Sequence, residues 1–323
     1  DQWVLRGGEP SFQVADSVAT DSNGNVSTLS RVTQVQEINE LNGLFRMPVR
    51  FEVHYKDGTF DPLEVWIENQ ETVVKLPNEK KKEILYVLFD PGRKVLKKVD
   101  FPQPMARRMA QASHAAEMID RYDALVLLRD VPLGLKSNFL AERFDAERFH
   151  LVKNEILKQL ANDSGSAAVL VKGKALTDSD ALVRKGALLS LGVIPGHYRE
   201  TVEKMLYDSS FINVELSLEL LCISFPDRIP GYLEETRDME GWRGKNIRMK
   251  WLEIAIMTGQ EDYLEELKNY CTPRYEFETR INAFLLLKRI GYRDDLTMRY
   301  AREAEKHWNR KLSGAAREYL NEK

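Results

Sequence analysis

Residues 47–55 read Met-Pro-Val-Arg-Phe-Glu-Val-His-Tyr, and this stretch decides the fold class of the N-terminal part of the chain. Apolar side chains occupy every second position from Met47 to Tyr55, and arginine, glutamate and histidine stand between them. Because side chains of a strand alternate between its two faces, the pattern predicts a strand with one buried face. Asp57-Gly58 follows closely, which is typical of a hairpin turn because glycine accepts a positive φ.

Further short strands are expected on both sides of this one. The apolar run 84–89 predicts a strand buried on both faces, and the turn sequence Asp90-Pro91-Gly92-Arg93 predicts that the next strand returns beside it. The other strands are expected at 11–19, 28–38, 63–67, 72–76 and 95–99. About seven short strands in roughly 100 residues predict a β-sandwich of immunoglobulin-like size over residues 1–102.

The apolar period changes to 3.6 after Pro102 and Pro104, so residues 105–323 are expected to be helical. This part contains an internal repeat marked by arginines, which are 63, 64 and 32 residues apart: Arg121, Arg184, Arg248 and Arg280. The positions three, four and seven residues after each arginine are apolar and line one helix face. Asp-Ser pairs at 178–179 and 208–209 are expected to cap the helices that follow them.

Repeats of about 30 residues with two helices each predict a helical solenoid with one continuous core. An aspartate near the loop and an arginine early in the second helix are common in HEAT-type arrays, and Asp180 with Arg184 fits that pattern. The arginines have two candidate roles. They hold the carboxylate of a ligand, or they pair with aspartates of the next repeat, which is the role we favour.

The composition excludes several classes of protein. The chain has 323 residues with 47 Lys plus Arg against 50 Asp plus Glu, and this near-neutral balance argues against a dedicated nucleic-acid binder. Two cysteines are too few for a disulfide framework or a zinc ribbon. With 43% apolar residues and no long apolar run, a soluble protein without a membrane span is expected.

Motifs that carry catalysis are missing from the sequence. There is no His-Glu-x-x-His, no Walker loop, no Gly-x-Gly-x-x-Gly and no Gly-x-Ser-x-Gly. The five histidines are more than 30 residues apart, so no two of them have the spacing of metal ligands on a helix. We therefore expect no catalytic residue, metal site or cofactor in this chain. The sequence predicts a binding or structural module.

Residues 2–12 read Gln-Trp-Val-Leu-Arg-Gly-Gly-Glu-Pro-Ser-Phe. This segment resembles zinc aminopeptidases of the aminopeptidase N type, in which a Trp followed by Gly-x-Pro marks the exit from the catalytic domain into a β-sandwich. The glutamine-rich residues 34–36, followed by Phe45-Arg46-Met47-Pro48, resemble the next strands of that sandwich, and Asp90-Pro91 with Val95-Leu96 resembles its closing hairpin. In that family a HEAT-like helical domain follows, so the resemblance covers the whole chain.

The resemblance implies that this chain is the non-catalytic C-terminal portion of a larger peptidase. The family's zinc motif and its Gly-Ala-Met-Glu-Asn motif belong to a catalytic domain that would precede Asp1, so zinc is implied for that domain only. In the family the sandwich is a spacer that contacts the catalytic domain. The helical bowl covers the active-site entrance, restricts access to short peptides and contacts peptides at its concave face. Basic residues of the bowl can reach a peptide's C-terminus in that family, so the resemblance makes Arg184 and Arg280 candidate substrate contacts.

An alternative is a non-enzymatic solenoid scaffold for protein–protein interaction, with a degenerate or absent peptidase domain. The coding sequence upstream of Asp1 discriminates between the two, because only the peptidase requires a His-Glu-x-x-His there. The sequence leaves the compartment open between the cytoplasm and a periplasmic or other extracytoplasmic location.

Overall fold

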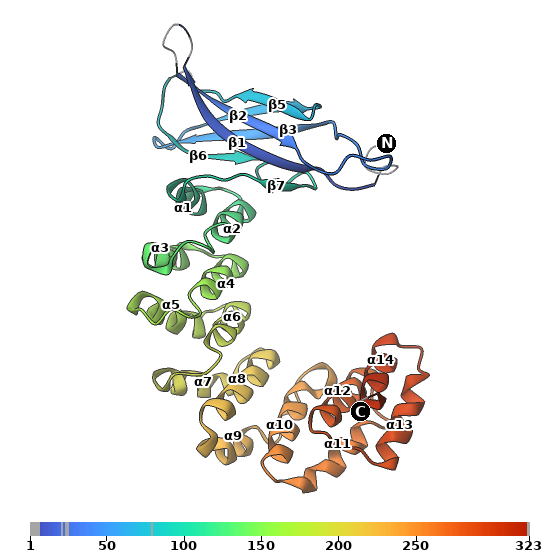
Figure 1. Ribbon diagram of the computed structural model, residues 1–323. Helices are drawn as coiled ribbons and strands as arrows, with labels where there is room; N and C mark the ends of the chain where they lie inside the picture. The colour runs from blue at the N-terminus through green and yellow to red at the C-terminus, as the bar shows by residue number, and fades with distance from the viewer. Residues whose placement is uncertain (1–6, 21, 23–25, 79, 322–323) are drawn as a thin grey trace. The chain divides into compact units, whose positions relative to one another are not determined.

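The computed structural model describes residues 7–20, 22, 26–78 and 80–321, so residues 2–6 of the N-terminal motif lie outside the described residues. The described chain starts with strands and continues with helices (Figure 1). It divides into two compact units, Asp1–Asp163 and Ser164–Lys323. The strands end at Asp100 and the first helix begins at Met105. The boundary between the two compact units lies at residues 163 and 164, in the helical part of the chain. The predicted domains 1–102 and 105–323 follow the change from strands to helices instead, and these limits remain a prediction.

The first unit contains two β-sheets. One has the strand order β5-β2-β1-β7 and the other has the order β4-β3-β6. The strands within the described residues are β1 (Ser11–Thr20), β2 (Val26–Gln34), β3 (Met47–Tyr55), β4 (Phe60–Ile67), β5 (Glu71–Lys75), β6 (Ile84–Phe89) and β7 (Lys98–Asp100). Side chains from both sheets, among them Phe12 of β1, Val32 of β2 and Phe51 of β3, form one apolar core.

Strand β3 has the burial that its sequence pattern predicts. Its residues Met47, Val49, Phe51, Val53 and Tyr55 are all buried, and the residues between them are exposed or half-buried. The hairpin to β4 is also confirmed, because β3 and β4 pair antiparallel and Gly58 in the turn has φ +82°.

The glutamine-rich end of β2 is tied to the segment that leads into β3. The Gln34 side chain donates to the Phe45 carbonyl at 2.9 Å and accepts from the Phe45 N–H at 2.9 Å. Gln36 donates to Gln34 Oε1 at 3.0 Å and to the Gly43 carbonyl at 3.1 Å. The side-chain amides satisfy backbone groups of Gly43 and Phe45, which lie outside the paired strands, and this explains why glutamines occur here.

The return strand predicted after β6 is wrong. Residues 98–100 form β7, which pairs parallel to β1 in the other sheet, with Ser11 opposite Lys98. The turn itself exists, since the Arg93 N–H donates to the Asp90 carbonyl at 3.0 Å and Gly92 has φ +75°. The Asp90 carboxylate also accepts from the Val95 N–H at 3.0 Å. Beyond this turn the chain continues to the sheet of β1 instead of pairing with β6.

Four helices complete the first unit: α1 (Met105–His114), α2 (Met118–Val126), α3 (Leu133–Ala146) and α4 (His150–Gln159). Helix α1 lies against β6, where Tyr86 and Leu88 pack with Ala110 and Ala115. The opposite face of β6 contributes Val87 to the sheet core. This two-sided cover explains why the β6 sequence is apolar throughout.

The second unit is helical. Its α-helices within the described residues are α5 (Ser166–Leu176), α6 (Ala181–Leu191), α7 (Arg199–Lys204), α8 (Phe211–Ser224), α9 (Ile229–Thr236), α10 (Asn246–Met257), α11 (Leu264–Tyr270), α12 (Phe277–Arg289), α13 (Asp295–Glu305) and α14 (Arg310–Leu320). Single-turn 3-10 helices join some of them: Gly196–Tyr198, Met205–Tyr207, Pro226–Arg228, Arg243–Lys245 and Glu261–Tyr263. No described helix is long and apolar enough to cross a membrane.

The repeated apolar positions are core positions, as the arginine register predicts. The residues three and four after each arginine are all at most 1% exposed: Ala124, Leu125, Ala187, Leu188, Trp251, Leu252, Ala283 and Phe284. The expected Asp-Ser caps are wrong. Helix α6 is capped by Asp180, which accepts from the Leu182 N–H, and Ser210 precedes α8 without a side-chain cap. Asp178 and Asp208 instead accept backbone N–H groups inside their loops.

Candidate functional site

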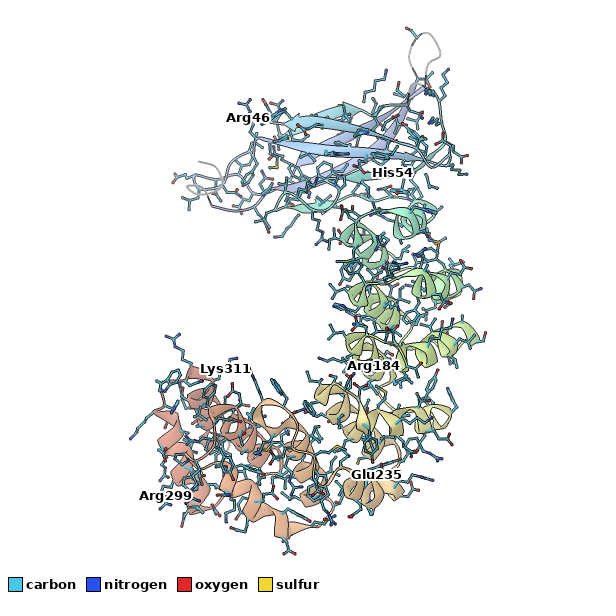
Figure 2. All side chains as sticks on the ribbon, turned by 180° about the vertical axis from the view of Figure 1, so that it is seen from behind. Arg46, His54, Arg184, Glu235, Arg299 and Lys311 are labelled. Carbon is cyan, nitrogen blue, oxygen red and sulfur yellow. The ribbon has the colours of Figure 1, made fainter. Side chains whose placement is uncertain are left out.

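Arg184, labelled in Figure 2, projects from α6 and is fully engaged by protein acceptors. Its Nε and Nη2 donate to the two oxygens of Asp208 at 2.6 and 2.7 Å. Its Nη1 donates to the carbonyls of Asp178 and Ser179 at 2.7 and 3.1 Å, in the loop before its own helix. The guanidinium thus ties one loop to the next, which is a structural task.

Two further arginines of the register have the same arrangement. Arg121 binds Glu147 through Nε at 2.8 Å and donates to the Ala116 carbonyl at 2.8 Å. Arg248 binds Glu266 through Nε at 2.7 Å and donates to the Arg237 carbonyl at 2.9 Å. The acid stands 26, 24 and 18 residues downstream for Arg121, Arg184 and Arg248. We call these three arginines and their acids the arginine ladder.

The charges of the ladder pairs hold each other ionised. Burial alone would raise the pKa of Asp208, but hydrogen bonds from Arg184 and from the Ser210 N–H outweigh it and hold that pKa below its ordinary value. Glu147 and Glu266 have lowered pKa values for the same reason, with Arg121 and Arg248 as the donors. Such fork-to-carboxylate pairs are strong and geometrically specific.

Arg280, the second candidate contact, departs from this arrangement. Only 4% of the residue is exposed. Its Nε donates to the Cys271 carbonyl at 3.1 Å, and its Nη2 lies 3.6 Å from Glu303 Oε1 without a hydrogen bond to any described residue. A peptide could reach Arg280 only if the side chains that bury it moved aside. The guanidinium of Arg184 is already paired with Asp208. The role of both as substrate contacts stays a prediction.

The histidine labelled in Figure 2 and the two cysteines are further side chains of kinds that often take part in chemistry. His54 (Figure 2) stacks on Phe60 and Tyr86, at 5.0 and 4.4 Å between ring centroids. Cys222 and Cys271 are buried, and burial raises the pKa of each thiol to about 12, so neither is an activated nucleophile. Among the described residues, no group of three or more His, Cys, Asp or Glu side chains could hold a metal ion.

A line of alternating charges crosses three neighbouring helices of the second unit. Lys250 of α10 binds Glu219 of α8 at 2.9 Å and Glu253 at 2.8 Å, and Glu253 binds Arg289 of α12 at 2.7 Å. Burial alone would lower the pKa of Lys250, but the hydrogen bonds to Glu253 and Glu219 raise it. We call these four residues the charge line.

A small cavity of about 100 Å³ adjoins the charge line and is also lined by Asn246, Asn282 and Leu285. The charge line could not be read from the sequence, because its members belong to three helices and carry no motif. We call the charge line together with the residues that line this cavity the α8–α10–α12 surface. The structure thus adds this surface to the candidate binding residues that the sequence predicts.

A further cavity lies within the first unit, between β6, the segment leading to β7, and helices α1 and α2. Its volume is about 430 Å³. Charged side chains in its walls include Arg93, Lys97, Arg108, Asp120 and Asp123. Sequence reasoning missed this site, because its walls come from segments that carry no local motif.

Comparisons with known proteins bear on the fold. No protein-family model matches the sequence, and no curated protein matches it. Among solved structures, the chain is similar to Legionella pneumophila aminopeptidase A in complex with aspartic acid, with a TM-score of 0.51 and 12% sequence identity. The similarity covers 99% of this chain and 45% of that chain, so this chain spans less than half the length of its neighbour. At this identity the likeness concerns the fold alone, which this chain shares with part of that protein.

Proposed function

We propose that this chain is the non-catalytic C-terminal portion of a zinc metallo-aminopeptidase of the aminopeptidase N type. The observation that carries the proposal is the structural similarity, which spans 99% of this chain and only 45% of a solved aminopeptidase. In the proposal the two sheets are an immunoglobulin-like β-sandwich that acts as a spacer. The helices are a HEAT-like solenoid that covers the active-site entrance, and the catalytic zinc belongs to the part of the parent protein outside this chain.

Exposed apolar side chains support the spacer role. Val35, Ile38 and Leu41 follow β2 and are 50%, 52% and 74% exposed, and Trp66 of β4 is 53% exposed. A sheet domain that folds around its own core does not need such side chains at its surface, whereas a domain that contacts a catalytic domain does. These residues are the proposed contact with the parent's catalytic domain.

The α8–α10–α12 surface is the proposed contact for peptides. The charge line offers both signs of charge. Arg289 donates to Glu253 through Nε and Nη2, but 52% of its side chain is accessible, so its remaining N–H donors can meet a peptide carboxylate. Arg184 and Arg280 remain weaker candidates because their side chains are only 14% and 5% exposed. Restriction to short peptides then follows from the helices occupying the space around the entrance.

The proposal is tested by comparing two purified proteins, this chain alone and the full product of its gene. We expect the full product to contain one zinc per chain and to hydrolyse leucyl-p-nitroanilide, and this chain alone to do neither. Hydrolysis or stoichiometric zinc in the isolated chain would overturn the proposal. A full product with neither property would instead favour the solenoid scaffold.

The peptide contact has its own test in the full product. Arg289→Gln is expected to raise KM for peptide substrates about 3- to 10-fold, because a partly exposed charge contact contributes roughly 1 kcal/mol. It should leave leucyl-p-nitroanilide hydrolysis unchanged, since that substrate has no C-terminal carboxylate. Arg299→Gln on α13 is the matched control, an exposed arginine outside the α8–α10–α12 surface. Equal effects of both variants would contradict the assignment.

A further inference from the structure

We propose that the cavity between β6, β7, α1 and α2 binds a small apolar carboxylate that also carries an N–H donor, such as an N-acylated amino acid or the C-terminus of a peptide. In this site Arg108 binds the carboxylate and Gln103 accepts the N–H. The proposal concerns the first unit alone and does not depend on the proposed peptidase function.

The cavity has the size and lining of a small-molecule site. Its volume of about 430 Å³ lies within the range of known ligand pockets, roughly 300–1,000 Å³. Apolar side chains make up much of its wall, namely Val87, Phe89, Val95, Val99, Phe101, Val126 and Leu127. Such a wall favours a branched aliphatic group over a fully polar ligand.

Arg108 is a buried cation without a counter-ion. Only 6% of the residue is exposed, and its Nη2 donates to the Phe101 carbonyl. Within the described residues no ion pair joins it to a carboxylate, and burial lowers its pKa, although Asp100 and Asp123 act against that shift from a distance. A guanidinium has five N–H donors, so most of them are free to bind an anion in the cavity. An unpaired buried charge is costly, and a bound carboxylate would offset that cost.

The other cations in the wall already have partners. Arg93 binds Asp123 through Nε at 2.7 Å, Lys97 pairs with the buried Asp90, and Lys98 binds Glu9 at 2.7 Å. Asp120 accepts the Gly92 N–H with both carboxylate oxygens, at 3.1 and 3.0 Å. Among the described wall residues, Arg108 is therefore the cation that a ligand's carboxylate can reach without breaking an existing pair.

Gln103 supplies the acceptor for the ligand's N–H. Its Nε2 donates to the Val87 carbonyl at 2.9 Å, which fixes the orientation of the amide because that oxygen can only accept. Its Oε1 is buried and has no hydrogen-bond partner among the described residues. Buried polar atoms are nearly always paired, so this acceptor calls for an N–H or O–H donor. A water molecule could supply that donor, but it could not neutralise Arg108.

The test is isothermal titration of this chain with N-acetyl-L-leucine, which offers a carboxylate, an N–H and a branched aliphatic group. N-acetyl-L-leucine amide lacks the carboxylate, and 4-methylpentanoate lacks the N–H. We expect the amide to bind at least about 10-fold more weakly, because it forfeits the charge-assisted contact, and 4-methylpentanoate to bind a few-fold more weakly. A tripeptide that ends in leucine distinguishes the two possible sources of the ligand, peptide C-termini and free N-acylated amino acids. If it binds as tightly as N-acetyl-L-leucine, the site is assigned to peptide C-termini. If it binds more weakly, the site is assigned to free small molecules.

Variants locate the binding. Arg108→Gln should weaken N-acetyl-L-leucine about 10- to 100-fold. Gln103→Leu should bring N-acetyl-L-leucine down to the affinity of 4-methylpentanoate while leaving 4-methylpentanoate unchanged, a result that also stands if Arg108→Gln fails to fold. Arg107→Gln is the control, since Arg107 is the neighbouring residue on α1 and pairs with Asp16 instead of lining the cavity. No binding of any probe at millimolar concentration, equal binding of acid and amide, or unchanged affinity in Arg108→Gln and Gln103→Leu would overturn the proposal.

Discussion

Replacing Arg184 with methionine removes the guanidinium of one ladder pair but keeps most of the side-chain volume. The side chains of Arg184 and Asp208 are 14% and 4% exposed. The change leaves the Asp208 carboxylate without its two hydrogen bonds at 2.6 and 2.7 Å, and it leaves two loop carbonyls without their donor. It therefore tests whether the arginine ladder is structural.

The expected loss of unfolding free energy follows from these contacts. Breaking a buried ion pair by removing one partner costs about 3–5 kcal/mol. The lower end applies here, because Asp208 keeps the Ser210 N–H at 2.8 Å and the Asn213 amide at 3.4 Å. We expect Arg184→Met to destabilise the chain by about 3 kcal/mol.

Urea denaturation of the purified chain, followed by circular dichroism, measures this loss. A double-mutant cycle with Asp208→Asn should give a coupling energy of about 2 kcal/mol. The Arg237–Glu234 pair is the matched control, because its side chains are 54% and 65% exposed and its coupling should stay below about 1 kcal/mol. Equal coupling energies at the two pairs, or a loss below about 1 kcal/mol for Arg184→Met, would refute the prediction that Arg184 stabilises the fold. Arg184 would then be a stronger candidate for a substrate contact.

The pH dependence of this pair has a definite sign. The pKa of Asp208 is held below its ordinary value of 3.8, so the stabilisation is fully present above that pH. It is lost as the pH falls through the lowered pKa of the folded state. In Arg184→Met burial raises the pKa of Asp208, because the opposing guanidinium is gone. The stability difference between the wild-type chain and Arg184→Met should therefore be constant at pH 7–8, begin to shrink when the pH falls to that raised pKa, and continue to shrink in stronger acid.

Three further predictions concern other parts of the chain. Burial raises the pKa of Asp120 from 3.8 to about 6, although the Gly92 N–H acts against it, so the folded state favours the protonated acid and loses stability as the pH rises through 6. Asp120→Asn should therefore stabilise the chain at pH 8, by at most about 3 kcal/mol, and solvent screening reduces that gain. At pH 3.5 the variant should show no such stabilisation, and thermal melts at the two pH values measure the difference. Gly244 and Gly259 both have positive φ, but a Cβ would lie 2.3 Å from the Asn282 amide at Gly244 and meets nothing within 4 Å at Gly259. Gly244→Ala should thus cost more stability in urea than Gly259→Ala, whose cost of about 1 kcal/mol is backbone strain alone. Phe51 is fully buried and Trp66 is 53% exposed, so Phe51→Ala should cost about 3–5 kcal/mol and Trp66→Ala much less; a similar loss at both would contradict the assigned core.

The strands were predictable wherever burial alternates along one segment. Strand β3 carries its whole buried face in its own sequence, and β6 is apolar throughout because the sheet core and α1 cover its two faces. The path after β6 was not predictable. The turn at Asp90-Pro91 has ordinary hairpin chemistry, and the partner choice of residues 98–100 depends on β1, which lies far away in sequence.

The candidate site divides in the same way. The arginine register was visible because Arg121, Arg184 and Arg248 repeat together with their apolar neighbours. Their acids were not, because they stand at variable distances downstream on loops and helices whose spacing differs. The Arg108 cavity was invisible for a related reason: Gln103 and Arg108 have no local pattern, and only the packing of α1 on the sheet reveals which of their atoms lack partners.

The proposal that this chain is part of a zinc aminopeptidase is tested most directly by sequencing the coding region immediately upstream of the Asp1 codon. We expect an uninterrupted reading frame that encodes His-Glu-x-x-His followed by a distant glutamate, the ligand set of a catalytic zinc. A frame that encodes no such motif would contradict it and leave the solenoid scaffold as the better account.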